Sequence, residues 1–364
     1  MTRPADNRNL PIESVDFKVA GIHLNSPLRI ANEYYSSSKT AFVRIKAGPF
    51  EGIGEAAPDR EVTGEDTESV VDFIEKARPH LTGKNALDIN GINGILDSLS
   101  KRDNTAKAGL DIALYDLMGK YLKKNVVSIL GGRGKSKLTS ITIGIEDEST
   151  TLKYAKKYRD SGFKVIKLKV GLDLEKDIIR LVKVREAVGR SIVLGVDANQ
   201  GYTVQEAMSF SSKAEPLRIA FLEQPVNARN FHGLKKVKES SSIPVMADES
   251  IKTINDLRKL ASIKAVSMIN IKLMKTGGIT KAMQIAKEAE KSGIGVMVGC
   301  MEESRVGISA GTHLSISIKD IGFADLDAHL THRNRFVASG LRTVQGRNIL
   351  TGGYGLGIKT NFRF

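Results

Sequence analysis

The stretch VIKLKVG, residues 165–171, decides the fold. It is rich in β-branched and apolar residues and ends at a glycine, so it predicts a short strand. Lys167 and Lys169 stand two residues apart, which in a strand places both ammonium groups on one face and the apolar side chains on the other. The rest of the chain explains why such a strand carries two like charges.

Short apolar runs of this kind recur about every 25 residues, and the eight of them begin at residues 139, 164, 192, 219, 243, 266, 294 and 321. Most intervals between them have the pattern of amphipathic helices, such as 173–189 and 280–293. Alternating strands and helices favour a parallel sheet covered on both faces, and eight strands favour a TIM-like (β/α) barrel over an open sheet. An array of internal repeats is the alternative, but the strand motifs do not resemble one another.

The chain before residue 136 has a different pattern. Residues 12–24 and 39–56 predict antiparallel strands with glycine turns, and residues 65–130 predict helices. We therefore expect an α+β domain at 1–135, which the tail 334–364 completes because that tail is too short to fold alone. The barrel, with the active site, is expected at 136–333.

One charged residue stands at or near the end of each of five successive predicted strands: Lys169, Asp197, Glu223, Asp248 and Lys272. The gaps between them are 28, 26, 25 and 24 residues. In a barrel the C-terminal strand ends converge on one face, where active sites are built. Each residue taken alone is better explained as a helix cap or a loop charge, but five in phase favour a common site.

Three of these residues, Asp197, Glu223 and Asp248, are carboxylates that would repel one another and attract a divalent cation. A ligand set of oxygens without Cys or His favours a hard ion, so Mg²⁺ is the expected cofactor. Magnesium commonly keeps positions for water or substrate oxygens, so we expect the substrate to complete its coordination.

The lysines explain the opening stretch. Lys167 and Lys169 are expected to face the metal and its bound anion, to lower each other's pKa, and so to permit general-base chemistry. Lys272 would approach from the opposite wall. Lysines on both sides of one carbon suit racemisation, epimerisation or elimination next to a carboxylate, with the metal stabilising the enediolate.

These motifs together resemble the enolase superfamily, in its muconate-lactonizing-enzyme-like subgroup; they are KLKVG, VDANQG, LEQP, MADES and INIKLMKTGG. The resemblance covers nearly the whole chain. It implies an N-terminal capping domain, a modified (β/α)7β barrel and Mg²⁺-assisted removal of a proton α to a carboxylate. It also implies catalytic roles for Lys169 and Lys272, with Lys167 assisting electrostatically at the substrate carboxylate.

The subgroup includes cycloisomerases, o-succinylbenzoate synthases, N-acyl amino acid racemases and dipeptide epimerases. Asp325 and Asp327 share a face of the eighth predicted strand, and two adjacent carboxylates make a receptor for an ammonium group. This Asp-x-Asp resembles the dipeptide epimerase signature that grips the α-ammonium of the first residue. N-acyl amino acid racemase and o-succinylbenzoate synthase are the alternatives, although neither substrate offers an ammonium.

The expected specificity rests on three further residues. Related Ala-Glu epimerases carry an arginine in the first loop, and Glu33 takes its place, so we expect dipeptides with a basic or neutral side chain instead. Glu302 adds a carboxylate near the mouth, or else pairs with Arg305. Thr142 is expected to touch the substrate carboxylate, although a purely structural role as a buried threonine explains its presence equally well.

Loops 32–38 and 58–66 are expected to form the lid over the active site.

Composition adds few constraints. The chain has 364 residues and a formal net charge of +14, which raises nucleic acid as a partner for a non-catalytic alternative. The basic residues are scattered, however, and no nucleic-acid-binding module is recognisable, so we expect none. There is one cysteine and no apolar run of membrane-spanning length, so a cytoplasmic enzyme without a membrane partner is expected. Assembly into a homo-oligomer is left open.

Overall fold

The computed structural model describes residues 9–333 and 336–364. The first sheet is antiparallel and consists of β1 (Ser14–Arg29), β2 (Tyr34–Ala47) and β3 (Phe50–Ala56). Its helical partners are α1 (Thr67–Leu81), α2 (Ile89–Leu99), α3 (Asn104–Leu122) and the single turn α4 (Val126–Ile129). The expected α+β character of this part of the chain is confirmed.

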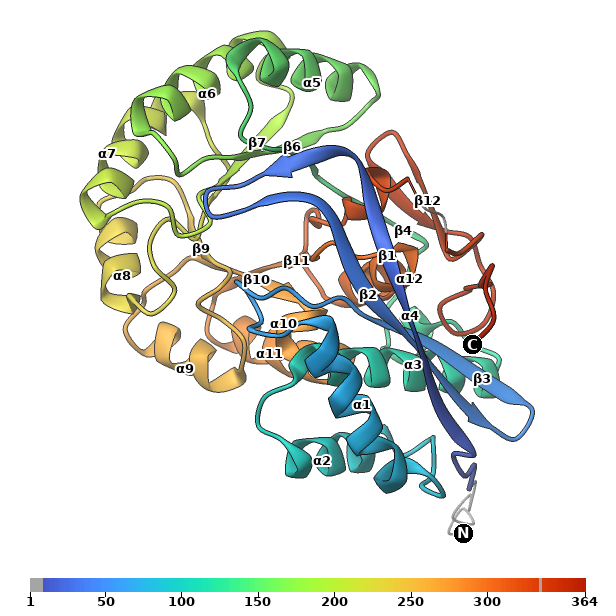
Figure 1. Ribbon diagram of the computed structural model, residues 1–364. Coiled ribbons are helices and arrows are strands. Elements are labelled where there is room, and N and C mark those ends of the chain that lie inside the picture. The colour runs from blue at the N-terminus through green and yellow to red at the C-terminus, as the bar shows by residue number, and fades with distance from the viewer. Residues whose placement is uncertain (1–8, 334–335) are drawn as a thin grey trace.

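The long hairpin of β1 and β2 extends from this sheet across the barrel (Figure 1). Its turn covers residues 30–33, and β2 already begins at Tyr34. The expected loop at 32–38 therefore has wrong bounds. The cause is the pairing of two tyrosines with the end of β1, since Tyr34 pairs with Arg29 and Tyr35 with Leu28.

Helix α3 is buried on nearly all sides between the first sheet and the barrel. Its close approach to β3 depends on glycine, because a Cβ atom on Gly54 would overlap the carbonyl oxygen of Gly109. The carboxylate of Asp116 in α3 accepts a hydrogen bond from the backbone N–H of Ile53 at 2.9 Å. These contacts fix the first sheet on the helix that supports the barrel.

The second sheet is parallel and curls into a barrel (Figure 1). Its strands, hydrogen-bonded in chain order, are β5 (Ile141–Ile143), β6 (Val165–Lys169), β7 (Val193–Asp197), β8 (Leu222–Glu223), β9 (Val245–Ala247), β10 (Met268–Lys272) and β11 (Gly295–Gly299). The outer helices are α5 (Glu148–Asp160), α6 (Leu174–Val188), α7 (Val204–Ala214), α8 (Phe231–Glu239), α9 (Ile254–Ser262), α11 (Ile279–Lys291) and α12 (Arg305–Ser317). Shorter turns are η1 (Glu215–Leu217), α10 (Leu273–Thr276) and η2 (Ala328–Leu330).

The eighth predicted strand is the one that differs from expectation. Among the described residues it forms only two bridges, Ala324 to Thr139 on one side and Asp325 to Gly299 on the other. The ladder stops there because the next N–H, that of Leu326, donates to the Thr139 hydroxyl at 2.9 Å instead of to a strand carbonyl. These two bridges close the ring between β5 and β11, so the modified TIM-like barrel is confirmed with a very short last strand.

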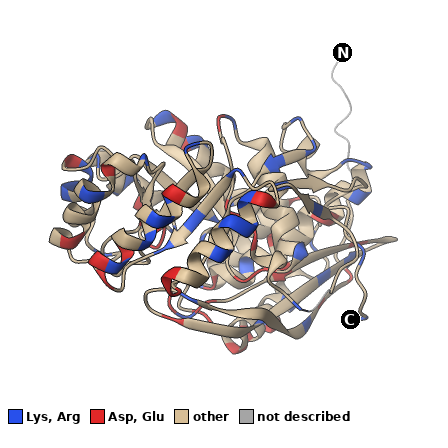
Figure 2. Cartoon of the chain, turned by 90° about the horizontal axis from the view of Figure 1, so that it is seen from above, with Lys and Arg blue, Asp and Glu red and all other residues tan. Residues whose placement is uncertain are grey.

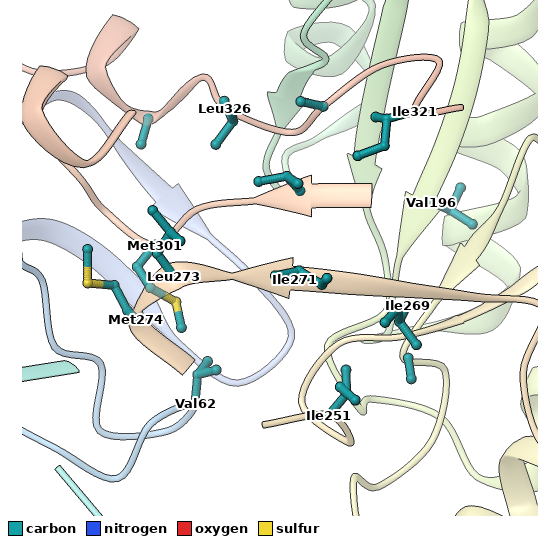
Figure 3. Packing of buried hydrophobic residues seen from close by; sticks show 14 of the residues in the cluster. Val62, Val196, Ile251, Ile269, Ile271, Leu273, Met274, Met301, Ile321 and Leu326 are labelled. Atoms are coloured by element: carbon teal, nitrogen blue, oxygen red, sulfur yellow. The ribbon is translucent and has the colours of Figure 1, made fainter. Parts of the chain in front are cut away.

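The main apolar core lies between the barrel strands and their helices. In β10, buried Ile269 and Ile271 join this core, while Asn270 and Lys272 alternate with them. Figure 3 shows Ile269 and Ile271 along the strand, with Met274 and Met301 near its end. Val62, from the 58–66 loop, belongs to the same cluster. That loop is therefore held against the barrel by apolar contacts.

The C-terminal tail contains β12 (Leu341–Val344) and β13 (Arg347–Leu350), and β13 pairs with β4 (Ser136–Leu138). The rings of Phe336 and Phe362 pack on Phe42 of β2, with centroid distances of 5.3 and 4.8 Å. The tail thus contacts both the first sheet and the start of the barrel. A domain division at 135/136, with 334–364 assigned to the first domain, stays a prediction.

Charged residues of both signs are interspersed over the outer helices (Figure 2). Several basic groups on these helices pair with acidic ones, such as Lys213 with Glu175 and Arg258 with Glu288. Within 9–333 and 336–364, no helix has the length and apolar character needed to cross a membrane.

Candidate active site

The strand register brings the predicted charges together at one end of the barrel. Lys169 is paired with Asp197 across β6 and β7, and Asp197 with Glu223 across β7 and β8. Asp248 follows β9 directly, and Lys272 ends β10. The expected convergence of these five side chains is therefore a structural fact.

Asp197, Glu223 and Asp248 form a fully buried triad whose ligand oxygens all lie within 4.8 Å of one another. Both Glu223 and Asp248 are charge-paired with lysines: Oε2 of Glu223 lies 2.8 Å from Nζ of Lys167, and Oδ2 of Asp248 lies 2.7 Å from Nζ of Lys272. Three buried carboxylates this close together, with no nitrogen or sulfur ligand among them, fit a hard divalent cation such as Mg²⁺. The triad could thus hold the expected metal.

Two lysines from β6 face this triad. Nζ of Lys167 lies 2.9 Å from Asp197, 2.8 Å from Glu223 and 2.8 Å from Asp325. Nζ of Lys169 lies 2.7 Å from Asp197 and donates to Oδ1 of Asn199 at 2.7 Å. Lys167 therefore links the triad to the eighth-strand carboxylate, whereas Lys169 is held nearer to the open pocket.

Lys272 reaches the same pocket from β10, four strands away from β6 in the sheet. Its Nζ lies 2.7 Å from Oδ2 of Asp248. Lys167, Lys169 and Lys272 all line one central cavity of about 100 Å³. The lysines therefore reach the cavity from different walls of the barrel, as expected.

Burial and charge shift the pKa values of these groups in opposite directions. Burial raises the pKa of Glu223 to about 8, and the neighbouring Asp197 adds to the rise. Burial also opposes the charged forms of Asp197 and Asp248, but the lysines outweigh it and hold the pKa of both carboxyls well below the ordinary value. At neutral pH the triad thus retains negative charge.

The expected lowering of the pKa is not found at Lys167. Burial lowers the pKa of Lys167, but Asp197, Asp325 and Glu223 outweigh it and raise the pKa well above its ordinary value. For Lys272, burial and Lys167 lower the pKa, and Asp248 reverses the result. The sequence spacing showed the nearby ammoniums but not how closely the carboxylates surround them.

Asp325 and Asp327 lie side by side on the wall of the central cavity. Asp325 is held by Lys167 at 2.8 Å and by the hydroxyl of Ser140 at 2.5 Å. Asp327 accepts a hydrogen bond from the backbone N–H of Thr142 at 2.6 Å. Burial, with the charge of Asp325, raises the pKa of Asp327 to about 7. A cationic group beside Asp327 would favour its ionised form.

The remaining predicted site residues, Thr142, Glu302 and Glu33, lie at or near the mouth of the central cavity. Thr142 and Glu302 line the cavity, and Oε2 of Glu302 lies 3.2 Å from Nε2 of His332. Glu33 does not line the cavity itself, but Tyr35 does, and its hydroxyl lies within hydrogen-bond distance of both Glu33 and Asp59 and can donate its one proton to either. The hairpin turn and the 58–66 loop therefore present a joint acidic edge.

Several polar residues of the site were not predicted from the sequence, because none of them is a charged residue at the end of a strand. Asn270 donates to Oε1 of Glu223 at 2.7 Å, and Asn199 connects Lys169 to Glu249, whose Oε1 it contacts at 3.1 Å. Lys275 is fully buried against Asp248. Asn199 and Asn270 each lie two residues from a predicted site residue, and this spacing could have identified them.

Comparison with known proteins decides the family. Residues 14–131 match the family model described as mandelate racemase / muconate lactonizing enzyme, N-terminal domain, and residues 150–363 match the one described as enolase C-terminal domain-like. The chain belongs to the enolase superfamily, in its muconate-lactonizing-enzyme subgroup. The family expected from the motifs is confirmed.

Among its superfamily relatives, the hydrophobic dipeptide epimerase of Enterococcus faecalis is 37% identical over 88% of this chain and 91% of its own. The N-succinyl-L-Arg/Lys racemase of Bacillus cereus is 34% identical over 86% and 88%. The crystal structure of an E. faecalis dipeptide epimerase with Mg and L-Leu-L-Tyr aligns with a TM-score of 0.93 at 35% identity, covering 96% of this chain and all of the other. This member of the enolase superfamily is an isomerase of the racemase and epimerase class that acts on amino acid derivatives.

Proposed function

We propose that the chain is a Mg²⁺-dependent dipeptide epimerase that inverts the α-carbon of the C-terminal residue. The observation that carries this proposal is the single cavity lined by Lys169 from β6, Lys272 from β10, and the pair Asp325 and Asp327. Two candidate bases and an acidic receptor for an ammonium thus face the same small volume. The chemistry of the relatives, dipeptide epimerisation and N-acyl amino acid racemisation, supports the same class of reaction.

The lysines would carry the proton transfer. One lysine, as a free amine, would remove the proton from the α-carbon, and the other, as an ammonium, would deliver a proton to the opposite face. The first becomes an ammonium and the second an amine, so the reaction is an isomerisation with no other reactant. A divalent cation on the triad would offset the carboxylate charge that raises the pKa of Lys272, which favours the free amine. Mg²⁺, held by Asp197, Glu223 and Asp248, would supply positive charge where the substrate carboxylate gains negative charge. Lys167 adds fixed positive charge next to this triad.

The acidic edge supports a preference for basic or neutral dipeptides over Ala-Glu. Glu33 and Asp59 share the hydroxyl of Tyr35, and Glu302 lines the same cavity as Tyr35 and Asp59. A glutamate side chain placed there would face three carboxylates at short range, which is unfavourable in a partly desolvated site. The cytoplasmic location stays a prediction from sequence.

N-acyl amino acid racemisation is the second candidate, and one observation favours it. Both oxygens of Asp325 are already engaged, by Lys167 and by Ser140, which leaves Asp327 as the main acceptor for an ammonium. A substrate without an ammonium would leave this arrangement undisturbed. o-Succinylbenzoate synthesis is a less favoured alternative, because its substrate also lacks an ammonium and no relative compared above has that activity.

The test is a substrate panel with Mg²⁺, read by chiral chromatography. It contains L,L-dipeptides with acidic, neutral and basic second residues, together with N-succinyl amino acids. We expect epimerised dipeptides, and we expect Asp327→Asn to raise KM for dipeptides at least tenfold, because a charge-assisted contact is lost. Asp160→Asn, on the exposed end of α5, is the matched control. Turnover of N-succinyl amino acids alone would refute the dipeptide proposal.

A further inference from the structure

A second, larger cavity of about 400 Å³ adjoins the central one. It lies between α5, the outer part of β1 and the C-terminal hairpin β12–β13 (Figure 1). Leu28, Thr142 and Thr331 line both cavities, so they form the shared boundary. The central cavity, at about 100 Å³, is well below the roughly 300 Å³ at which ligand pockets begin. A dipeptide with a large side chain therefore needs additional space.

The larger cavity begins at the end of the site that would hold the ammonium. The N–H of Thr142 donates to Asp327 at 2.6 Å, and Thr142 lines both cavities. Tyr158 lines the larger cavity, and burial together with the charge of Asp327 raises the pKa of its phenol to about 12. Neither Lys169 nor Lys272 lines it. Whatever occupies this space therefore lies beside the ammonium, away from the carbon that loses its proton.

Much of the wall of the larger cavity is apolar and aromatic, although Glu146 and Lys157 line it as well. Tyr154 and Tyr158 are stacked with ring centroids 6.0 Å apart, and Phe163 meets Tyr158 edge-on at 5.9 Å. Ile141 and Ile143 of β5 complete the inner side. Aromatic side chains arranged in this way favour a flat or branched apolar group over a charged one.

We propose that this cavity binds the side chain of the N-terminal residue of the dipeptide and selects large apolar or aromatic side chains there. The inference rests on the proposed dipeptide epimerisation, since only a dipeptide places an α-ammonium at Asp327 and a side chain next to it. It assigns Tyr154 and its stacking partner Tyr158 to substrate selection. Both lie on α5, apart from the lysines and the metal triad.

The experiment compares kcat/KM for Leu-X and Ala-X dipeptides that share one second residue X. We expect the wild-type protein to prefer Leu-X, and Tyr154→Ala to lower the Leu-X to Ala-X ratio about tenfold, which is within the range for removing apolar contacts in a pocket. Tyr154→Phe keeps the ring and should keep the ratio. Tyr354→Ala, at an exposed tyrosine far along the tail, is the matched control.

Each outcome decides the inference. A ratio that falls in Tyr154→Ala but holds in Tyr154→Phe and Tyr354→Ala supports it. An unchanged ratio in Tyr154→Ala, with dipeptides still epimerised, overturns the cavity assignment and leaves the proposed function intact. An equal fall in Tyr354→Ala also overturns it, because the effect is then not local. If no dipeptide is epimerised by the wild-type protein, both proposals fail together.

Discussion

Lys275 is a buried cation whose partners belong to the proposed metal site. Its Nζ contacts the backbone and carboxylate oxygens of Asp248 and the carbonyl of Asn270 at 3.0 Å. We predict that Lys275→Met lowers the free energy of unfolding by about 3–5 kcal/mol, because it leaves a buried carboxylate without one of its partners. Denaturant unfolding measures this change.

The control for this prediction is Lys213→Met, which breaks an exposed ion pair with Glu175. Such pairs contribute less than about 1 kcal/mol, so stability should hardly change. Equal losses in the two variants would contradict the structural role assigned to Lys275.

Glu33 gives the acidic edge a pH dependence. Burial raises its pKa to about 7, and the charges of Asp59 and Glu61 add to the rise. A raised pKa means that the carboxylate is charged above about pH 7 and neutral below it. We predict that the kcat/KM preference for a basic over a neutral second residue falls as the pH drops through 7. In Glu33→Gln the same ratio should be lower and flat; an identical pH profile in that variant would rule out this role.

The charged site residues could be predicted because the ends of parallel strands meet, so spacing along the chain becomes proximity in space. The same logic could not find Lys275, which sits one turn beyond β10, in α10. Nor could spacing give the direction of the pKa shift at Lys167, because that depends on three carboxylates within 3 Å.

At the scale of elements, Glu55 joins the first sheet to the last barrel helix. Its buried carboxylate in β3 accepts hydrogen bonds from the N–H groups of Ser304 and Gly307, at 2.9 and 2.8 Å, at the start of α12. The residues just before α12 include Met301 and Glu302, which line the central cavity. The Glu55 carboxylate of β3 therefore caps the N-terminus of α12.

We predict that Glu55→Ala lowers the free energy of unfolding by roughly 3 kcal/mol or more, since two buried N–H donors lose a charged acceptor. KM should rise more than kcat falls, because the cap positions the mouth of the site and not the lysines. Unfolding and steady-state kinetics provide the two readouts. Glu51→Ala, exposed on the same strand, should leave both unchanged; a KM effect there would contradict the prediction.

The alternation of strands and helices was predictable from period and spacing, and seven of the eight expected runs are strands. The eighth run is reduced to two bridges, because the N–H of Leu326 donates to the Thr139 hydroxyl and not to a strand carbonyl. The length of the hairpin of β1 and β2 was underestimated for a different reason. Its outer half contains serines and other polar residues that look like a loop, and only pairing across the hairpin makes them strands.

At the scale of the whole molecule, three buried carboxylates couple metal binding to folding. A ligand that binds only the folded state at a hundred times its Kd raises the free energy of unfolding by about 2.7 kcal/mol. We predict a gain of this size on adding Mg²⁺, reversed by chelation, in thermal or denaturant unfolding. Glu223→Gln should abolish most of the gain. Glu175→Gln, on an exposed residue, should keep it, and a gain that survives in Glu223→Gln would place the metal elsewhere.

The central claim is that Lys169 and Lys272 act on opposite faces of one α-carbon, and α-proton exchange in D₂O tests it most directly. NMR would follow the α-proton of the second residue in each epimer of a dipeptide, with Mg²⁺. The wild-type protein should exchange both epimers. Lys169→Ala and Lys272→Ala should both lose epimerisation, while each still exchanges one epimer, a different one in each variant. Epimerisation that persists in either variant, or takes place without incorporation of deuterium, would contradict the two-lysine mechanism.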